Sequence, residues 1–201
     1  MKCKILEKAS EMFLSLGFKS VTMDDISNEL AISKKTLYTH FSTKKKLVES
    51  VSLYMFDIID NGIQGICKKK QNPIEELFDI KRFVNNILKK EDTSPQYQLQ
   101  KFYPDIFESL SKKQFNTMLI CVKNNLERGI KDGLYRSDLN VDFISRIYFT
   151  GMSGIKNEDI YSKEQFNQMW LIDSYLEYHL RAITTEKGLN TLTQILNNNK
   201  D

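Results

Sequence analysis

The chain has 201 residues, of which 41% are hydrophobic and 27% charged, and its 29 basic and 26 acidic residues leave a net charge of +3. These proportions fit one or two folded domains and exclude a disordered chain. Eight glycines and three prolines are too few for the frequent turns of a β-sandwich or barrel, and no apolar run approaches the roughly 18 residues of a membrane-spanning helix.

The N-terminal residues and the cysteines predict the compartment. Glu7 interrupts the first apolar run and no cleavage site follows it, so we expect no secretory signal. The three cysteines, Cys3, Cys67 and Cys121, are odd in number and far apart in the sequence. They fit a reducing cytoplasm better than a disulfide framework or a zinc site. We therefore expect a cytoplasmic protein without a bound metal or cofactor.

Apolar residues recur at helical spacing almost throughout, which predicts an all-α fold of about nine or ten helices. Gly17 ends the first helix, and Thr22 with Asp25 forms a capping box that opens a second. Ser33 caps a third helix and Thr43 caps a long fourth one. The caps, prolines and glycines that follow predict helices over 72–90, 112–131, 140–152, 162–180 and 186–196, with further helix starts at 94–95 and 103–104.

The excess positive charge lies in the first quarter of the chain. Residues 1–50 carry nine lysines and six acidic residues, whereas the remainder carries 20 residues of each sign. Within residues 31–50, five lysines stand against one glutamate. This concentration indicates either contact with a polyanion or a solvated basic face, and charge alone does not separate the two.

The positions of those five lysines favour a polyanion. Lys34 and Lys35 fall in the first turn of the third predicted helix, and Lys44, Lys45 and Lys46 fall in the first turn of the fourth. A helix N-terminus carries about half a positive charge, so a lysine there is unfavourable. Phosphate groups beside these helix ends would offset the repulsion, which predicts a nucleic-acid contact.

The second and third predicted helices are joined by only about three residues, as a helix-turn-helix motif requires. Helical spacing places Leu37 and Phe41 on the inward face of the third helix. The side chains that it turns outward or to the flanks are Lys35, Thr36, Tyr38, Thr39 and His40. They are rich in hydrogen-bonding groups, so this face is suited to a major groove.

Residues 5–50 resemble the DNA-binding domain of the tetracycline-repressor (TetR/AcrR) family of bacterial transcription regulators. The densest part of the match is the run Ser33-Lys34-x-Thr36-Leu37-Tyr38-x-His40-Phe41-x-x-Lys44. The resemblance implies a DNA-binding domain over residues 1–48, continuous with a larger helical ligand-binding and dimerisation domain over residues 49–201. It also implies a homodimer that binds double-stranded DNA at a palindromic operator and acts as a repressor released by a small molecule.

The DNA-contacting residues expected from the motif and the resemblance are Thr22, Ser33, Lys34, Lys35, Thr36, Tyr38, Thr39, His40, Lys44 and Lys45. The sequence departs from the family pattern at three places. Ala31 stands where the family commonly has glycine in the turn, which predicts either local strain or an altered turn geometry. Lys35 replaces a residue that is usually small, and Lys45 and Lys46 stand where acidic residues are common, which predicts altered operator choice and stronger DNA binding.

Two sets of residues in the larger domain are expected to carry its functions. Aromatic residues suited to an apolar ligand pocket are Phe83, Phe102, Phe107, Phe115, Tyr148 and Phe149. Residues suited to a dimer interface are Phe166, Trp170, Tyr175 and Leu176. For both sets the alternative is that they simply fill the core of a single chain.

Catalysis is not expected, because the two histidines, His40 and His179, are isolated and no motif of a hydrolase, metalloprotease or nucleotide-binding enzyme occurs. The alternative to a sequence-specific regulator is a helical adaptor or a nonspecific DNA-binding protein without an inducer. An adaptor would have a more apolar and less basic outward face on the third helix than the one described above.

Overall fold

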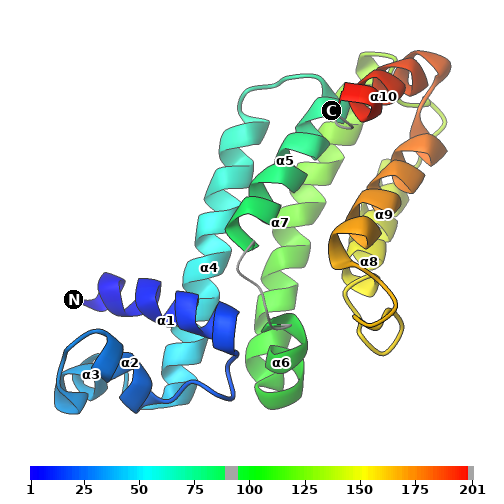
Figure 1. Ribbon diagram of the computed structural model, residues 1–201. Coiled ribbons are helices and arrows are strands. Elements are labelled where there is room, and N and C mark those ends of the chain that lie inside the picture. Colours follow the sequence, from blue (N-terminus) through cyan, green and yellow to red (C-terminus); the bar gives the residue numbers. More distant parts are fainter. Residues whose placement is uncertain (89–94, 199–201) are drawn as a thin grey trace. The chain divides into compact units, whose positions relative to one another are not determined.

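The computed structural model describes residues 1–88 and 95–198, and within these residues the chain forms ten α-helices and no β-strand (Figure 1). Their bounds are α1 Lys2–Leu16, α2 Met23–Glu29, α3 Lys34–His40, α4 Lys44–Cys67, α5 Pro73–Leu88, α6 Pro95–Phe102, α7 Pro104–Lys131, α8 Val141–Gly154, α9 Gln168–Ile183 and α10 Glu186–Asn198. The all-α prediction is confirmed. Ser94 and the predicted helix end near Lys90 lie outside the described residues. No helix in the described part is both long and apolar enough to span a bilayer.

The predicted caps of the first domain are confirmed by hydrogen bonds. The hydroxyl of Thr22 accepts from the amide of Asp25 at 3.1 Å, and the Asp25 carboxylate accepts from the Thr22 amide at 2.8 Å, which completes the capping box. The hydroxyl of Ser33 accepts from the Thr36 amide at 3.0 Å. Thr43 accepts from the Lys46 amide at 3.2 Å. These bonds fix where α2, α3 and α4 begin.

Two predicted helix boundaries in the remainder were wrong. The start expected at 103–104 is confirmed, because α7 begins at Pro104, but the separate start expected at Lys112 is wrong, because α7 continues through that residue. The start expected at Ser162 lies later, at Gln168, because the side chain of Asn167 accepts from the amides of Met169 and Trp170. The carbonyl of Ser162 instead accepts from the amide of Phe166 at 3.0 Å, which closes a turn.

The chain packs as two compact units. Unit 1 consists of Met1–Gly62 with Phe83–Gln114, and unit 2 of Ile63–Arg82 with Phe115–Asp201. Helices α4, α5 and α7 each contribute residues to both units. The packing therefore divides differently from the functional boundary expected at residue 48, which stays a prediction.

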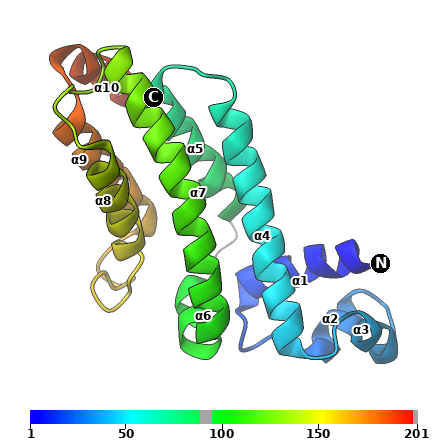
Figure 2. The ribbon, with the colours of Figure 1, turned by 180° about the vertical axis from the view of Figure 1, so that it is seen from behind.

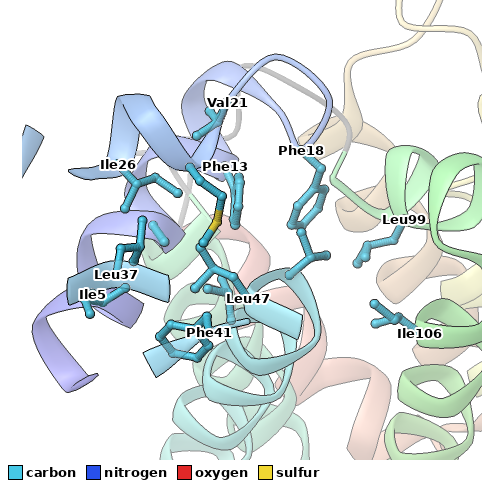
Figure 3. Packing of buried hydrophobic residues seen from close by; sticks show 14 residues of the cluster. Ile5, Phe13, Phe18, Val21, Ile26, Leu37, Phe41, Leu47, Leu99 and Ile106 are labelled. Carbon is cyan, nitrogen blue, oxygen red and sulfur yellow. The ribbon is translucent and has the colours of Figure 1, made fainter. Parts of the chain in front are cut away.

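The core of unit 1 holds the helix-turn-helix region together. Apolar side chains from α1, α2, α3 and α4 converge on it, and α6 and α7 add Leu99 and Ile106 (Figure 3). Leu37 is completely buried and Phe41 nearly so, which confirms the predicted inward face of α3. Full burial of a side chain of this size contributes about 1.5–3 kcal/mol, so these two residues anchor a helix of only seven residues.

Unit 2 has a separate apolar core with a buried polar group inside it. Helices α8 and α9 lie side by side in both views (Figures 1 and 2). The carboxylate of Glu76, on α5, accepts from the side chains of Asn125 and Arg128, on α7. The hydroxyl of Tyr135 donates to Asn125 at 3.0 Å. This network ties α5, α7 and the segment after α7 into one body.

Candidate nucleic-acid interface

The turn between α2 and α3 sets the geometry of the candidate interface. After the last turn of α2, the amide of Ala31 donates to Asn28 and the amide of Ile32 donates to Ser27, both at 3.0 Å. This pair of bonds is the Schellman motif, which places its central residue in the left-handed region. Ala31 accordingly has a φ of +52°. The strain predicted from the replacement of glycine by alanine is therefore present in the backbone.

Helix α3 turns polar and aromatic side chains to the surface. Lys35, Tyr38, Thr39 and His40 are exposed, and Thr36 is half-buried. Thr36 and Thr39 have local partners, because the hydroxyl of Thr36 lies 2.8 Å from that of Ser33 and the Thr39 hydroxyl donates to the carbonyl of Lys35 at 2.8 Å. The long exposed side chains of α3 that remain available to a binding partner are therefore those of Lys35, Tyr38 and His40.

Ion pairs within unit 1 hold several of the lysines. Lys34 pairs with Asp24 at 2.6 Å, and Lys45 pairs with Asp105 at 2.6 Å. Lys46 pairs with Glu49 at 2.9 Å. All three pairs are solvent-exposed, so each contributes little stability and a phosphate can compete with the carboxylate. Sequence reasoning missed these carboxylate partners, because only Glu49 is a near neighbour of its lysine along a helix.

The electrostatic environment agrees with this pairing. The hydrogen bond to Asp24 raises the pKa of Lys34, and the one to Glu49 raises the pKa of Lys46. The hydrogen bond from Lys45 lowers the pKa of Asp105. Each of these shifts in pKa favours the charged form of Lys34, Lys46 or Asp105.

Lys44 differs from the other lysines at the start of α4. Its ammonium group is half-buried and donates to the carbonyl of Lys19 at 3.2 Å. Burial lowers the pKa of Lys44, and the nearby carboxylate of Asp25 opposes that effect. Asp25 is the capping residue that binds Thr22, so the start of α2 and the start of α4 are electrostatically linked. We therefore expect Lys44 to position these helix ends and Lys45 and Lys46 to be the more accessible cations.

The expected ligand-binding aromatics fall into two groups. Phe83, Phe102 and Phe107 belong to unit 1, and Phe115, Tyr148 and Phe149 belong to unit 2. The ring of Phe83 occupies the space that a side chain at Gly62 would need. Phe102 lies under the ammonium of Lys19, and Phe107 packs on the core of unit 1.

In unit 2, Phe115 and Phe149 meet edge to face with ring centroids 5.0 Å apart. Tyr148 is buried against Tyr175 and His179. Of the three expected ligand-binding residues in unit 2, Phe115 and Phe149 are therefore in contact, and Tyr148 belongs to the apolar core. Two cavities among residues 1–88 and 95–198 are lined by other residues than these aromatics.

The expected dimer residues also differ among themselves. Trp170 is 57% exposed and stacks on the half-buried Phe166. Leu176, in contrast, is 2% exposed and lies in the core of unit 2, so it has no surface to offer a partner. Tyr175 is half-buried and its hydroxyl donates to the carbonyls of Ile147 and Tyr148. Leu176 therefore fits the core alternative, whereas Tyr175 packs against that core and its part in a dimer stays a prediction.

Four exposed apolar residues of α8 and α9 were not among the dimer residues expected from the sequence. They are Phe143, Ile147, Met169 and Tyr178. Phe143 and Ile147 lie four residues apart on α8, and Tyr178 lies eight residues after Trp170 on α9, so each pair shares a helix face. That spacing was readable in the sequence, but the inward and outward faces could not be assigned without the core.

Residues 1–88 and 95–198 contain no group of three or more His, Cys, Asp or Glu side chains placed to hold a metal ion.

Comparisons with known proteins agree with the helix-turn-helix reading. Residues 5–51 match the family model described as bacterial regulatory proteins, tetR family. The chain is 27% identical over 198 residues to the HTH-type transcriptional repressor KstR2 of Mycolicibacterium smegmatis, with 92% of this chain and 91% of that protein covered. It is 25% identical over 146 residues to IcaR of Staphylococcus aureus, a negative transcriptional regulator of the icaADBC biofilm operon, with 60% of this chain and 78% of that protein covered.

Solved structures extend the likeness to the whole fold. A TetR-family transcriptional regulator from Agrobacterium tumefaciens superposes with a TM-score of 0.72 at 18% identity, covering 92% of this chain and 97% of that one. A putative TetR-family regulator from Mesorhizobium loti gives a TM-score of 0.66 at 18% identity, covering 92% and 96%. The curated relatives are transcriptional regulators and not enzymes. The dense helix-turn-helix motif, the polar face of α3 and these matches together show that residues 5–51 are similar to the DNA-binding domain of bacterial regulators of the tetR family, and that the fold of the chain is similar to that of TetR-family structures.

Proposed function

We propose that this protein is a homodimeric, sequence-specific repressor that reads a palindromic operator with α3 and responds to a small molecule. The observation that carries the proposal is the surface of α3, where Lys35, Tyr38 and His40 are exposed beside the lysine-rich start of α4. Lysine meets base edges or phosphates, whereas tyrosine and histidine steady the DNA backbone. We propose that residues 1–48 bind DNA and that residues 49–201 bind the ligand and form the dimer.

The exposed apolar residues of α8 and α9 support the homodimer. Phe143, Ile147, Met169, Trp170 and Tyr178 are exposed on two neighbouring helices of unit 2. Exposed apolar patches on otherwise folded surfaces mark interaction sites. A dimer built on this face would be symmetric, and its two copies of α3 would lie about 34–36 Å apart, one turn of DNA, on a palindromic site.

Sedimentation tests the dimer. We expect the protein to sediment at twice the 23.5 kDa of one chain at micromolar concentration. Tyr178→Glu should reduce the mass to that of one chain. Ile120→Glu is the matched control, because Ile120 is 64% exposed on α7, outside the proposed face. A wild-type protein that stays a monomer contradicts the proposal.

The small-molecule response is the least constrained part of the proposal. The Phe115–Phe149 pair lies beside Arg146, whose guanidinium is 5.6 Å from the Phe115 ring centroid and forms an exposed ion pair with Asp142 at 2.8 Å. An anionic group of a ligand can compete with that carboxylate for Arg146. Such a combination of aromatic rings with a cation suits an apolar molecule with an anionic group. Coupling between ligand and DNA sites typically changes affinity by about 5- to 150-fold. Equal operator affinity with and without every compound that raises the melting temperature refutes this part.

Selection of bound sequences from a random DNA library tests operator recognition. We expect one palindromic site to be enriched, and we expect Lys35→Ala and Tyr38→Ala to weaken or relax the selection. Lys112→Ala is the matched control, because Lys112 is an exposed lysine of unit 1 that pairs with Glu108 on α7. It removes the same charge without touching α3, so its selected site should be unchanged.

The alternative is a helical adaptor or a nonspecific DNA-binding protein. A protein that contacts only phosphates loses affinity for all sequences equally as salt rises, whereas a repressor keeps a gap of about 10³ or more for its operator. No enriched site, with binding that disappears at moderate salt, would favour this alternative.

A further inference from the structure

Two thiols of unit 2 lie in contact. Cys67 is the last residue of α4 and Cys121 lies within α7, 54 residues later in the chain. Their sulfur atoms are 3.2 Å apart. The S–S bond of a disulfide is about 2.05 Å long, so the two sulfurs need to approach by only about 1 Å to form one.

Both thiols are half-buried, which makes them accessible to a small oxidant without placing them on an open surface. The third cysteine, Cys3, is exposed on α1. The distance and the partial burial distinguish the Cys67–Cys121 pair from two cysteines that merely occur in one domain. A metal is not the better explanation, because no third ligand joins the pair among the described residues.

The surrounding groups assign different roles to the two sulfurs. The hydrogen bond from the Cys121 thiol lowers the pKa of Cys67, and Arg128 acts in the same direction, while burial and Glu76 oppose it. The same hydrogen bond and burial raise the pKa of Cys121. Both shifts in pKa favour Cys67 as the thiolate of the pair, and hence as its nucleophile.

We propose that Cys67 and Cys121 are a redox modification site that forms a reversible intramolecular disulfide when the protein meets a hydroperoxide. The thiolate of Cys67 attacks hydrogen peroxide, an S–O bond forms and the O–O bond breaks, which gives a sulfenic acid. The departing hydroxide takes up the proton that the Cys67 thiol released and leaves as water. The sulfur of Cys121 then attacks that of Cys67. An S–S bond forms, the S–O bond breaks, and the departing hydroxide leaves with the proton of Cys121 as a second water.

This sequence of steps balances. Two thiols and hydrogen peroxide give one disulfide and two waters, so the sulfurs lose the two electrons that the peroxide gains. A dithiol returns the pair to the reduced state by thiol–disulfide exchange. The bond ties the end of α4 to α7 within unit 2.

Peptide mapping of the wild-type protein tests the disulfide directly. The protein is treated with hydrogen peroxide, denatured, alkylated and digested with trypsin. Cleavage after lysine releases Cys67 in peptide 47–68 and Cys121 in peptide 114–123. We expect these two peptides to be joined, with a mass about 2 Da below the sum of the reduced peptides. Prior reduction with dithiothreitol should release both.

Thiol titration with variants assigns the chemistry to the pair. Oxidation should leave one of the three thiols of the wild-type protein titratable and none of the two in Cys3→Ser. Cys121→Ser should form no internal disulfide and should accumulate the sulfenic acid at Cys67, which a dimedone adduct on peptide 47–68 would report. Unjoined peptides from oxidised wild-type protein, or a link through Cys3 in their place, overturn the proposal.

A regulatory consequence rests on the proposed function. Helix α4 begins at Lys44, in the candidate DNA-contact surface, and ends at Cys67. We expect oxidised and reduced Cys3→Ser protein to differ in affinity for the selected DNA site by at least about fivefold. The Cys3→Ser/Cys121→Ser variant should show no such difference. Equal affinities refute this coupling, whereas failure of both forms to select any DNA site refutes the proposed function and leaves the mapped disulfide as evidence for the thiol chemistry.

Discussion

Asp105 restrains one of the cations of the candidate DNA-contact surface, so its removal should strengthen DNA binding. Its carboxylate accepts from the ammonium of Lys45 at 2.6 Å, and both side chains are solvent-exposed. A phosphate that contacts Lys45 must first displace this carboxylate. In Asp105→Asn the side chain keeps its size but loses its charge. The ammonium of Lys45 is then available to the DNA backbone.

The expected magnitude follows from the number of phosphates that are neutralised. Each phosphate contact adds about 0.9 to the slope of log affinity against log salt on duplex DNA. One additional contact in each subunit of a dimer gives a change of about 1.8. Over a fourfold change in salt concentration, the affinity of the variant should therefore fall about tenfold more than that of the wild-type protein.

Fluorescence anisotropy with labelled duplex DNA at several salt concentrations measures this slope. Glu108→Gln is the matched control, because it removes the same charge one turn later in α7, where Glu108 pairs with Lys112. The double variant Asp105→Asn/Lys45→Ala should lose the gain. A slope for Asp105→Asn equal to that of the wild-type protein, or an equal gain in Glu108→Gln, would refute the assignment of Lys45 to phosphate.

Three predictions concern stability. Ala31→Gly should raise the free energy of unfolding by about 0.5–1 kcal/mol, because glycine adopts the φ of +52° without strain, and urea denaturation would measure it. Burial lowers the pKa of His179 from 6.5 to about 4, so the unfolded state takes up the proton first as pH falls. Stability present above pH 6.5 should then be lost between pH 6.5 and 4, by about 3 kcal/mol at most, and His179→Gln should show a smaller loss over the same range. Arg128→Ala should cost about 3 kcal/mol because it leaves the buried carboxylate of Glu76 without its cation, whereas Arg128→Ala/Glu76→Gln should recover part of that loss in the same denaturation assay.

Local chemistry explains the features that the sequence predicted well. The caps of α2 and α3 depend on a hydroxyl and an amide three residues apart, so Thr22 and Ser33 contain the information for both helix starts. The inward positions of Leu37 and Phe41 follow from helical spacing within seven residues. The turn at Ala31 is equally local, because its two hydrogen bonds close within five residues.

The features that the sequence did not predict depend on contacts between distant segments. Asn167 and Ser162 are both good capping residues, and the choice of Asn167 is fixed only when the preceding segment folds into a turn. Leu176 and Trp170 lie on one predicted apolar helix, and only the packing of unit 2 buries the first and exposes the second. The contact of Cys67 with Cys121 spans 54 residues, beyond the reach of any local rule.

The structure also changes the argument that linked the lysines to DNA. The sequence predicts that phosphates of DNA offset the repulsion between these lysines and the helix N-termini. In the structure, however, Lys34, Lys45 and Lys46 each form an ion pair with a carboxylate of unit 1. Those carboxylates already offset part of the repulsion from the helix dipoles in the free protein. The electrostatic case for DNA therefore rests most firmly on Lys35, which is exposed in the first turn of α3. Exposed ion pairs exchange partners readily, so the paired lysines add to binding only to the extent that phosphate displaces their carboxylates, and that exchange is what the salt dependence of Asp105→Asn measures.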